Sequence, residues 1–314
     1  MIKNFFPLGL NLFFLFSCAR SIAGLGIVEN EKAIVIRQGE QHVLTYHKAE
    51  MDPPEGTSPL FRRSAFIHPL TAPNGAVVTD IHTPDHTHHM GLWHAWVHAE
   101  HKGRKVDFWN LKKGQGTVRY VETQAIRRGE DRVGFSVIQH HVMLPNEIIL
   151  KEVLSVDVRV SPDGAYLVDY QTVQENITDT PLKLPAYRYG GCLAYRGPPQ
   201  WNQTNSAILT SAGKDRENGH ETRADWCRFT GPTDAGPVAV TFLAHPTNHD
   251  APQRQRIWPG KSNNGAVFYN FVPIQEHDWS LAPGVQHTMK YQLVLSAGTP
   301  DKAKIDGWFK AFSK

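Results

Sequence analysis

The sequence is poor in cysteine, in net charge and in long apolar runs. Three of its 314 residues are cysteine, and 33 Lys and Arg residues against 30 Asp and Glu residues give a formal net charge of +3. Basic residues occur in runs no longer than pairs, so the chain lacks the electrostatic surface that binds nucleic acid. After residue 16, no apolar run approaches the roughly 20 residues of a transmembrane helix. We therefore expect neither a nucleic-acid partner nor a membrane-spanning segment beyond the amino terminus.

The amino-terminal segment predicts export. An apolar run over residues 5–16 precedes small residues, which is typical of a secretory signal and too short for a stable membrane anchor. Cleavage after Ala23 would remove residues 1–23 and leave a mature chain of residues 24–314. A bacterial lipobox-like sequence instead predicts a lipid anchor at Cys18. Both alternatives place the protein in the periplasm, outside the cell or on a membrane surface.

Alternation of apolar and polar residues dominates the rest of the chain. Ranges with this pattern or with short β-branched runs are predicted strands: 33–47, 116–128, 132–144, 148–162, 165–177, 237–246, 265–275 and 287–298. Tight turns between them predict an all-β fold, an antiparallel two-sheet β-sandwich forming a single domain. The stretch 248–265 is long for a structureless loop and is predicted to be functional. Cys192 and Cys227 form either a disulfide or, as the simpler expectation, two buried thiols.

Residues 82–96, "HTPDHTHHMGLWHAW", contain five histidines. Pro84 and Gly91 oppose a helix, so we expect a loop over 85–91, a strand from Leu92, and a turn at Lys102-Gly103 into a return strand. The histidine cluster serves either acid–base chemistry or metal ligation, because an imidazole suits both. In extended backbone, alternate histidines of the loop point at one metal and the remaining one turns away. Glycine at position 91 permits the positive φ that would bring neighbouring histidines to one site.

Several segments, taken in order, resemble the PmoA-like family of exported bacterial proteins. They are "FIHPLTAPNGAVVTD", "DHTHHMGLW", "VDFWN", "RYGGCLAYRG", "DWCRFTGP" and "VTFLAHPTNHDAPQRQRIWP". The family's methane oxygenase label does not fit this chain, since the methane-oxidising subunit is a membrane protein. The resemblance implies a supersandwich like that of galactose mutarotases, with carbohydrate chemistry in a groove. Met90 stands where that family usually has arginine, so an anionic ligand is not expected there.

Site residues follow from the cluster and from this resemblance. His88 and His89 are the first acid–base candidates, His245 is expected beside them, and Glu276 is preferred to Glu175 as the carboxylate that mutarotase-like chemistry needs. Trp93 and Trp258 are preferred to Trp96 and Trp109 as platforms for a sugar face. The other predicted substrate-binding residues are Asp85, His86, Arg188, Asn248, Arg254 and Arg256.

Three interpretations stay open. The first is an exported carbohydrate-active enzyme, an epimerase, lyase or hydrolase that acts on a sugar or glycoside by histidine acid–base chemistry without a cofactor. The second is a metalloenzyme that holds a divalent transition metal with His86, His88 and His89, with His245 as a further ligand. The third is a glycan-binding sandwich without catalysis, against which the histidine cluster counts.

Overall fold

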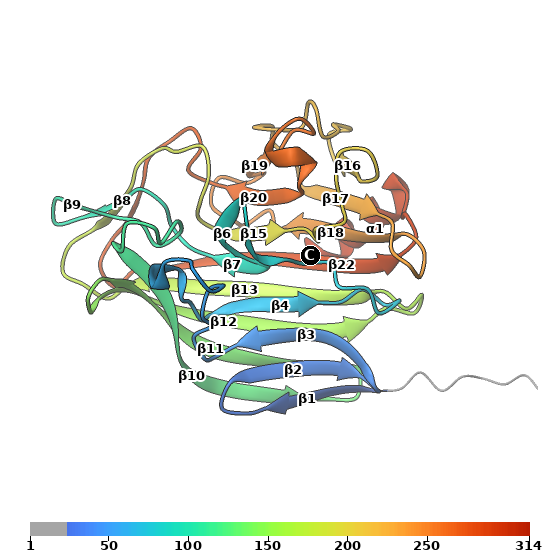
Figure 1. Ribbon diagram of the computed structural model, residues 1–314, viewed down its shortest axis with the longest axis horizontal. Coiled ribbons are helices and arrows are strands. Elements are labelled where there is room, and N and C mark those ends of the chain that lie inside the picture. The colour runs from blue at the N-terminus through green and yellow to red at the C-terminus, as the bar shows by residue number, and fades with distance from the viewer. Residues whose placement is uncertain (1–23) are drawn as a thin grey trace, which may run out of the picture.

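The computed structural model describes residues 24–314, which form two large antiparallel sheets packed face to face (Figure 1). The first sheet has the order β1 (Leu25–Glu29), β2 (Ala33–Gln38), β3 (Gln41–His47), β4 (Phe66–Leu70), β7 (Leu92–His94), β15 (Leu193–Arg196), β20 (Phe268–Val272), β19 (Arg254–Ile257). The second has the order β10 (Gly116–Arg128), β11 (Arg132–Met143), β12 (Glu147–Val160), β13 (Tyr166–Asn176), β22 (Gln286–Ala297), β18 (Val238–Ala244), β17 (Trp226–Gly231), β16 (Ala207–Thr210).

Smaller elements surround this sandwich. A four-stranded sheet contains β21 (Trp279–Leu281), β14 (Leu182–Leu184), β8 (Ala99–His101) and β9 (Arg104–Val106). A two-stranded sheet pairs β5 (Ile81–Thr83) with β6 (His86–Met90). The helical elements are the 3-10 turns η1 (Pro59–Phe61) and η2 (Asn263–Gly265) and the carboxyl-terminal helix α1 (Lys302–Phe312). Within residues 24–314, no helix is long and apolar enough to cross a membrane.

The predicted fold class is confirmed: the chain is an all-β antiparallel two-sheet sandwich. Strict alternation produces the strands of the second sheet, as in β13, where every second side chain from Tyr166 to Asn176 is buried. The signal-peptide and lipid-anchor predictions fall on residues 1–23, which lie outside the described residues, and export remains a prediction.

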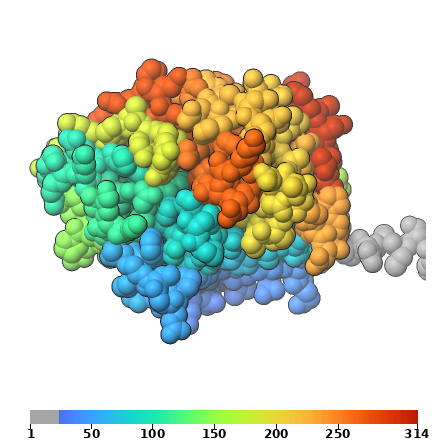
Figure 2. Space-filling model, turned by 45° about the horizontal axis from the view of Figure 1, so that its top comes forward, coloured from blue at the N-terminus to red at the C-terminus, as the bar shows by residue number. Residues whose placement is uncertain are grey.

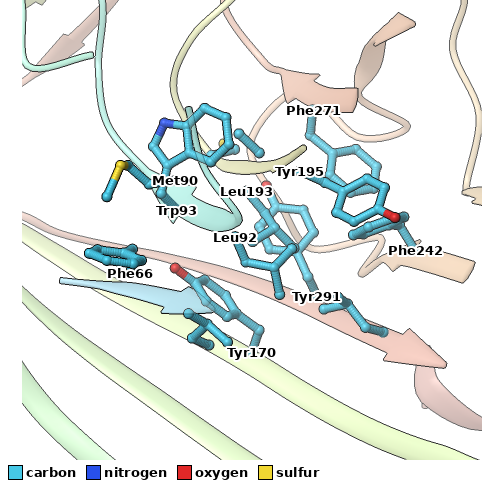
Figure 3. Close-up of a cluster of buried hydrophobic side chains, with 14 of the residues drawn as sticks. Phe66, Met90, Leu92, Trp93, Tyr170, Leu193, Tyr195, Phe242, Phe271 and Tyr291 are labelled. Carbon is cyan, nitrogen blue, oxygen red and sulfur yellow. The ribbon is translucent and has the colours of Figure 1, made fainter. Parts of the chain in front are cut away.

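The hydrophobic core fills the space between the two sheets (Figure 3). Leu92 of β7 and Tyr195 of β15 face Phe242 and Tyr291 of the opposite sheet, and all four side chains are buried. Trp93 lies on the other side of β7, away from this interior (Figure 3). Alternation along β7 therefore gives one residue to the core and the next to the outer face of the first sheet.

Three local predictions need correction. Residues 33–47 form a hairpin of two strands with Gly39 (φ 57°) in its turn. Residues 86–90, predicted as loop, form strand β6, because β5 supplies a pairing partner that local sequence does not reveal. Residues 254–257, inside the predicted long loop, form edge strand β19, which pairs with β20. The predicted turn at Lys102-Gly103 is confirmed, since β8 and β9 pair across it.

Both cysteines of residues 24–314 are free thiols. Cys192 and Cys227 are fully buried, in agreement with the simpler of the two expectations. Burial raises the pKa of Cys192 to about 12, which keeps this thiol protonated and unreactive at neutral pH.

A buried ionic network lies between the sheets, directly inside β7. Glu152 has no exposed surface and accepts hydrogen bonds from His94 Nδ1 (3.0 Å), Thr172 Oγ1 (2.7 Å), His141 Nε2 (2.6 Å) and Gln174 Nε2 (3.1 Å). The network thus joins β7 of the first sheet to β11, β12 and β13 of the second.

Candidate functional site

Strand β6 brings three histidines to one place. Thr83 pairs with His86 and Ile81 with Met90, so β6 has more residues than β5 between these two pairs and is irregular there. Because this irregularity breaks the alternation, the rings of all three histidines converge: His86 and His88 lie 5.5 Å apart between centroids, His86 and His89 4.7 Å, and His88 and His89 4.8 Å. The prediction that His89 turns away from the other two was wrong.

The turn that follows β6 depends on Gly91. Its φ is +65°, as the sequence predicted for a turn at this position, and a Cβ atom there would lie 2.4 Å from the carbonyl oxygen of Ile67. Glycine therefore allows β6 to fold close over β4 and hold its histidines above the outer face of the first sheet.

The three histidines line a pocket of about 130 Å³ on the outer face of the first sheet. A cavity of about 150 Å³ holds a benzene ring, so the pocket has room for about one six-membered ring. Segments far apart in the sequence meet on this face, coloured cyan to teal, yellow-green and orange in Figure 2. The lining residues are His86, His88, His89, Trp109, Asn110, Arg188, Tyr189, Arg256, Trp258 and Phe268.

Aromatic rings form one wall of the pocket. The ring of His89 lies nearly parallel to that of Phe268, with 4.8 Å between centroids and 19° between planes, and Trp258 lies 4.8 Å from Phe268. Trp93 packs behind His89 at 5.1 Å and is 1% exposed, so it supports the site from beneath and does not line the pocket. Among residues 24–314, the buried Nε1–H groups of Trp93 and Trp258 find no hydrogen-bond acceptor.

A carboxylate orients one of the histidines. Asp85 Oδ2 lies 3.1 Å from His86 Nδ1, and Arg196 fixes Asp85 through two hydrogen bonds, from Nη2 to Oδ1 (2.8 Å) and from Nη1 to Oδ2 (3.0 Å). Burial raises the pKa of Asp85, but the hydrogen bonds and charge of Arg196 outweigh it and bring the pKa down to about 2. Ionised Asp85 thus accepts a hydrogen bond from the Nδ1–H group of His86. This leaves Nε2 of His86 free to accept a proton from a ligand in the pocket.

The other two histidines are held neutral. Burial is the main cause that lowers the pKa of His88 to about 3, and burial also holds the pKa of His89 well below its usual range. The charge of Arg196 adds to this effect on both. His88 and His89 therefore present uncharged rings to a ligand at neutral pH.

A second polar chain reaches the pocket from the segment that follows β9. Asp107 Oδ1 accepts hydrogen bonds from the backbone N–H groups of Trp109 and Asn110, both at 2.9 Å, and its Oδ2 accepts from Asn110 Nδ2 at 2.6 Å. Asn110 Oδ1 in turn accepts the hydroxyl proton of Tyr189 at 3.2 Å. Burial raises the pKa of Tyr189 to about 12, so this phenol stays protonated at neutral pH.

Sequence reasoning missed part of this lining. Asn110 and Tyr189 were not predicted, although both stand in segments that carry the family resemblance, and Trp109 was ranked below Trp93. Arg196, which fixes Asp85, was missed because β15, which is distant in sequence, pairs with β7 and so comes to lie beside β6 only in the folded chain.

Arg188 and Arg256 were predicted and do line the pocket. Their guanidinium carbons lie 5.6 Å and 5.2 Å from the ring centroid of Tyr189. Arg256 reaches the pocket because alternation along β19 turns Arg254, Arg256 and Trp258 to the same, outer side of the sheet.

The structure places four predicted site residues elsewhere. His245 follows β18 of the second sheet, and its ring contacts Phe312 of α1 at 5.3 Å. Asn248 bonds the backbone of Lys290 at 2.9 Å and 2.8 Å, and the expected approach of both residues to His88 and His89 was wrong. The segment after Ala244 crosses from the second sheet to the first before Arg254, so its two ends lie on different sheets.

The remaining two form ion pairs beside the pocket. Glu276 accepts hydrogen bonds from Arg254 and from Arg223 Nη2, the latter at 3.1 Å. Both Glu276 and Arg254 line an open groove of about 390 Å³, which shares Arg188 with the histidine pocket. Glu175, the second choice for a carboxylate, lies on β13 and bonds Gln286 Nε2 at 3.1 Å. In the described chain, no Asp or Glu side chain lines the histidine pocket.

The donor set also bears on the metal alternative. Across residues 24–314, no three His, Cys, Asp or Glu side chains are arranged to hold a metal ion together. His86 keeps its Nε2 free because Asp85 engages Nδ1, but His89 Nδ1 lies 3.5 Å from the guanidinium of Arg196. A cation beside a ligand nitrogen disfavours a second cation, so His86, His88 and His89 do not fit a divalent metal in this arrangement.

Comparison with solved structures finds weak likenesses. A GalM/aldose epimerase homologue from C. elegans is 10% identical, with 88% of this chain and 100% of that chain covered and a TM-score of 0.36. A putative mutarotase (YeaD) from Salmonella typhimurium is 8% identical, with 87% and 90% covered and a TM-score of 0.39. Heparan sulfate lyase HepC from Pedobacter heparinus is 8% identical, with 90% of this chain but 36% of the lyase covered, and a TM-score of 0.33. Likenesses of this size leave function to be argued from the residues of the site.

Sequence comparison gives the family. No curated protein matches the chain. The family model that matches does not test the resemblance to the PmoA-like family, which stays a prediction. The matching family model covers residues 33–310, which is nearly all of the described chain. The protein therefore belongs to the family of unknown function DUF6807.

Proposed function

We propose that the protein is a carbohydrate-active enzyme that moves protons to and from a sugar ring in the histidine pocket. The observation that carries this proposal is the Asp85–His86 pair, in which a carboxylate 3.1 Å from Nδ1 leaves Nε2 to the pocket. A base whose tautomer is fixed by a third group is the arrangement that general acid–base catalysis requires. The catalytic assignment thus moves from His88 and His89, the first candidates from sequence, to His86, which alone of the three has a carboxylate partner.

Tyr189 supplies the complementary acid. Its hydroxyl is protonated at neutral pH and is already oriented by Asn110 at 3.2 Å. The aromatic wall of Trp109, Trp258 and Phe268 offers flat apolar surfaces of the kind on which a sugar ring stacks.

Among the reactions considered, proton abstraction fits the pocket better than hydrolysis. Glycoside hydrolases typically place two carboxylic acids around the bond that breaks. No Asp or Glu from the described residues lines this pocket, and Glu276 is held by two arginines in the neighbouring groove. Epimerisation or elimination needs one base and one acid, which His86 and Tyr189 provide.

Solvent exchange tests the proposal directly. Wild-type protein in D₂O is incubated with a panel of neutral and acidic mono- and disaccharides, and loss of each C–H signal is followed by NMR. We expect exchange or turnover at one ring position for at least one sugar, and a fall of about 100-fold or more in His86→Gln. His277→Gln, a change at an exposed histidine outside the pocket, serves as the matched control and leaves the rate unchanged. A glycan-binding sandwich without catalysis would bind a sugar but exchange none of its C–H protons.

A further inference from the structure

Two arginines of the histidine pocket have no partner of their own. In residues 24–314, the side chains of Arg188 and Arg256 neither donate a hydrogen bond nor form an ion pair; each contacts a face of Tyr189. Arg188 is exposed at the rim, whereas Arg256 is half-buried. Buried cations are normally paired, so the guanidinium of the half-buried Arg256, which has no acceptor within the described residues, is available to bind a ligand.

The neighbouring arginines are paired. Arg196 binds both oxygens of Asp85, at 2.8 Å and 3.0 Å. Arg223 binds Asp250 at 3.0 Å and shares Glu276 with Arg254. Free cationic charge is thus concentrated at the pocket, and it is not a general property of this surface.

The charge in the pocket is also uncompensated by its other lining groups. Burial lowers the pKa of Arg256, and the nearby charge of Arg188 lowers it further. His88 and His89 are neutral, and no lining residue is acidic. An anion bound between the two guanidinium groups would relieve their mutual repulsion and accept their hydrogen bonds.

We infer that the pocket binds a sugar acid and that Arg188 and Arg256 hold its carboxylate. The inference rests on the proposed function and names its substrate class. Two guanidinium groups match the planar carboxylate through parallel N–H···O hydrogen bonds. The pocket's volume of about 130 Å³ and its aromatic wall fit one pyranose ring carrying that carboxylate. Because Met90 stands where the PmoA-like family usually has arginine, the sequence did not predict an anionic ligand there. Arg188 and Arg256 provide the positive charge from other strands and loops.

A carboxylate at this place also makes the chemistry feasible. His86 Nε2 takes the proton from the ring carbon next to the carboxylate. As that C–H bond breaks, its electron pair moves into the carboxylate. The growing negative charge of the carboxylate faces the two arginines. The pair then returns to carbon with a new proton from Tyr189, or it expels the substituent on the adjacent carbon, which takes that proton. The first course is epimerisation and the second is elimination, and neither needs an oxidant or a metal.

Binding measurements with matched sugars test the inference. Isothermal titration calorimetry compares methyl β-D-glucuronide with methyl β-D-glucoside, and the corresponding galactose pair, which differ by a carboxylate against a hydroxymethyl group. We expect an acidic glycoside to bind at least tenfold more tightly than its neutral partner and to weaken as NaCl is raised. Arg256→Gln and Arg188→Gln should each weaken acid binding about 10- to 100-fold and leave neutral binding unchanged. Arg256→Lys should recover part of the loss, while Arg223→Gln, a paired arginine outside the pocket, should match wild type.

Each other outcome overturns the inference in a distinguishable way. Equal affinity for acidic and neutral glycosides, unaffected by Arg256→Gln, refutes the carboxylate clamp but leaves the proposed function standing if C–H exchange occurs on the neutral sugar. Tighter binding of glucose 6-sulfate, or equal binding of inorganic sulfate or phosphate, shows a site for another anion and refutes a sugar acid. If no sugar of either class binds or exchanges, the proposed function fails together with the inference.

Discussion

The carboxylate of Glu152 lies 2.6 Å from Nε2 of His141 in the interior of the sandwich, where neither side chain has any exposed surface. Burial opposes ionisation of Glu152, but the charge of His94 and the hydrogen bonds of His141 and His94 hold its pKa well below the usual range. The buried guanidinium of Arg63 bonds the carbonyl oxygen of His94 at 3.0 Å and adds positive charge to the same region. This buried polar network, in which His141 Nδ1 and Arg63 Nη1 have no hydrogen-bond partner, fixes how β7, the strand beneath the histidine pocket, sits on the second sheet.

Removing the centre of this network should destabilise the protein. Glu152→Ala leaves His94, His141, Thr172 and Gln174 without their shared acceptor in a site that has no access to water. We expect the free energy of unfolding to fall by about 3–5 kcal/mol, measured by urea denaturation. Glu122→Ala, at an exposed position of β10, should change it by less than about 0.5 kcal/mol. Equal effects of the two substitutions would contradict a structural role for the network.

The buried histidines should make the fold sensitive to acid. Folded His88 takes up a proton only near pH 3, because its pKa is lowered from 6.5 to about 3, whereas the unfolded chain takes it up near pH 6.5. Between these values the unfolded state binds more protons, so stability is lost as pH falls, by up to about 1.4 kcal/mol per pH unit for this residue. The free energy of unfolding of His88→Gln should therefore fall less steeply between pH 6 and pH 4. His277→Gln, at an exposed position, should keep the wild-type slope; identical slopes for all three proteins would show that His88 is not buried in its neutral form.

Gly91 offers a test of the close approach between β6 and β4. An alanine Cβ at this position meets the carbonyl oxygen of Ile67 at 2.4 Å in addition to the strain of φ +65°. Gly75 also has positive φ (+89°), but a Cβ there meets nothing within 4 Å. Gly75→Ala should cost only the conformational strain, about 1–2 kcal/mol, and Gly91→Ala should cost clearly more in thermal melts. If the two variants melt together, β6 does not fold tightly onto β4.

The sequence predicted six of the eight strands of the second sheet, because each of these six carries its own alternation, but it did not predict β16 and β17. Residues 116–128 were predicted as a strand and form β10 with the same bounds, and the predicted strand 165–177 differs from β13 (166–176) by one residue at each end. Short strands were harder: β6 of the two-stranded sheet and β19 at the edge of the first sheet are strands only because a neighbouring segment folds back and pairs with each of them. Local alternation cannot report such pairing.

The site was predicted in part for the same reason. His86, His88 and His89 are neighbours in sequence, so their shared location followed from local pattern. Arg188 and Arg256 reach the same pocket from separate segments; the family resemblance singled out Arg188, and the long loop predicted to be functional singled out Arg256. His245 shows the limit of both arguments, since nearness in sequence to Arg256 did not predict that a crossover between the sheets separates them.

Metal analysis separates the acid–base interpretation from the metalloenzyme alternative. The pocket gathers the cations Arg188 and Arg256, and Arg196 stands 3.5 Å from Nδ1, one of the two ring nitrogens of His89. We expect protein purified without chelators, and then dialysed against Zn²⁺, Co²⁺ or Ni²⁺, to retain well under one ion per chain by elemental analysis, and its melting temperature to be unchanged by EDTA. One tightly held ion per chain that is lost in His88→Ala would instead establish the metal site.

The relation between Asp85 and His86 allows a direct spectroscopic test that needs no substrate. If Asp85 accepts the Nδ1 proton, His86 carries its proton on Nδ1 in the wild type and has a free Nε2, which long-range ¹H–¹⁵N NMR correlations of the imidazole report. In Asp85→Asn the amide no longer enforces that tautomer, so we expect the Nε2–H form of His86 to appear. We also expect the rate of C–H exchange in a sugar substrate to fall by about 10²- to 10⁴-fold with little change in KM.

Asp85→Glu keeps a carboxylate and should recover part of the rate. Asp52→Asn breaks an exposed ion pair with Arg62 and should leave both the His86 spectrum and the rate as in wild type. An unchanged tautomer of His86 in Asp85→Asn would remove the structural basis for assigning His86 as the base. A lower melting temperature of this variant would not rescue the assignment, because loss of the ion pair with Arg196 lowers stability without moving a proton on His86.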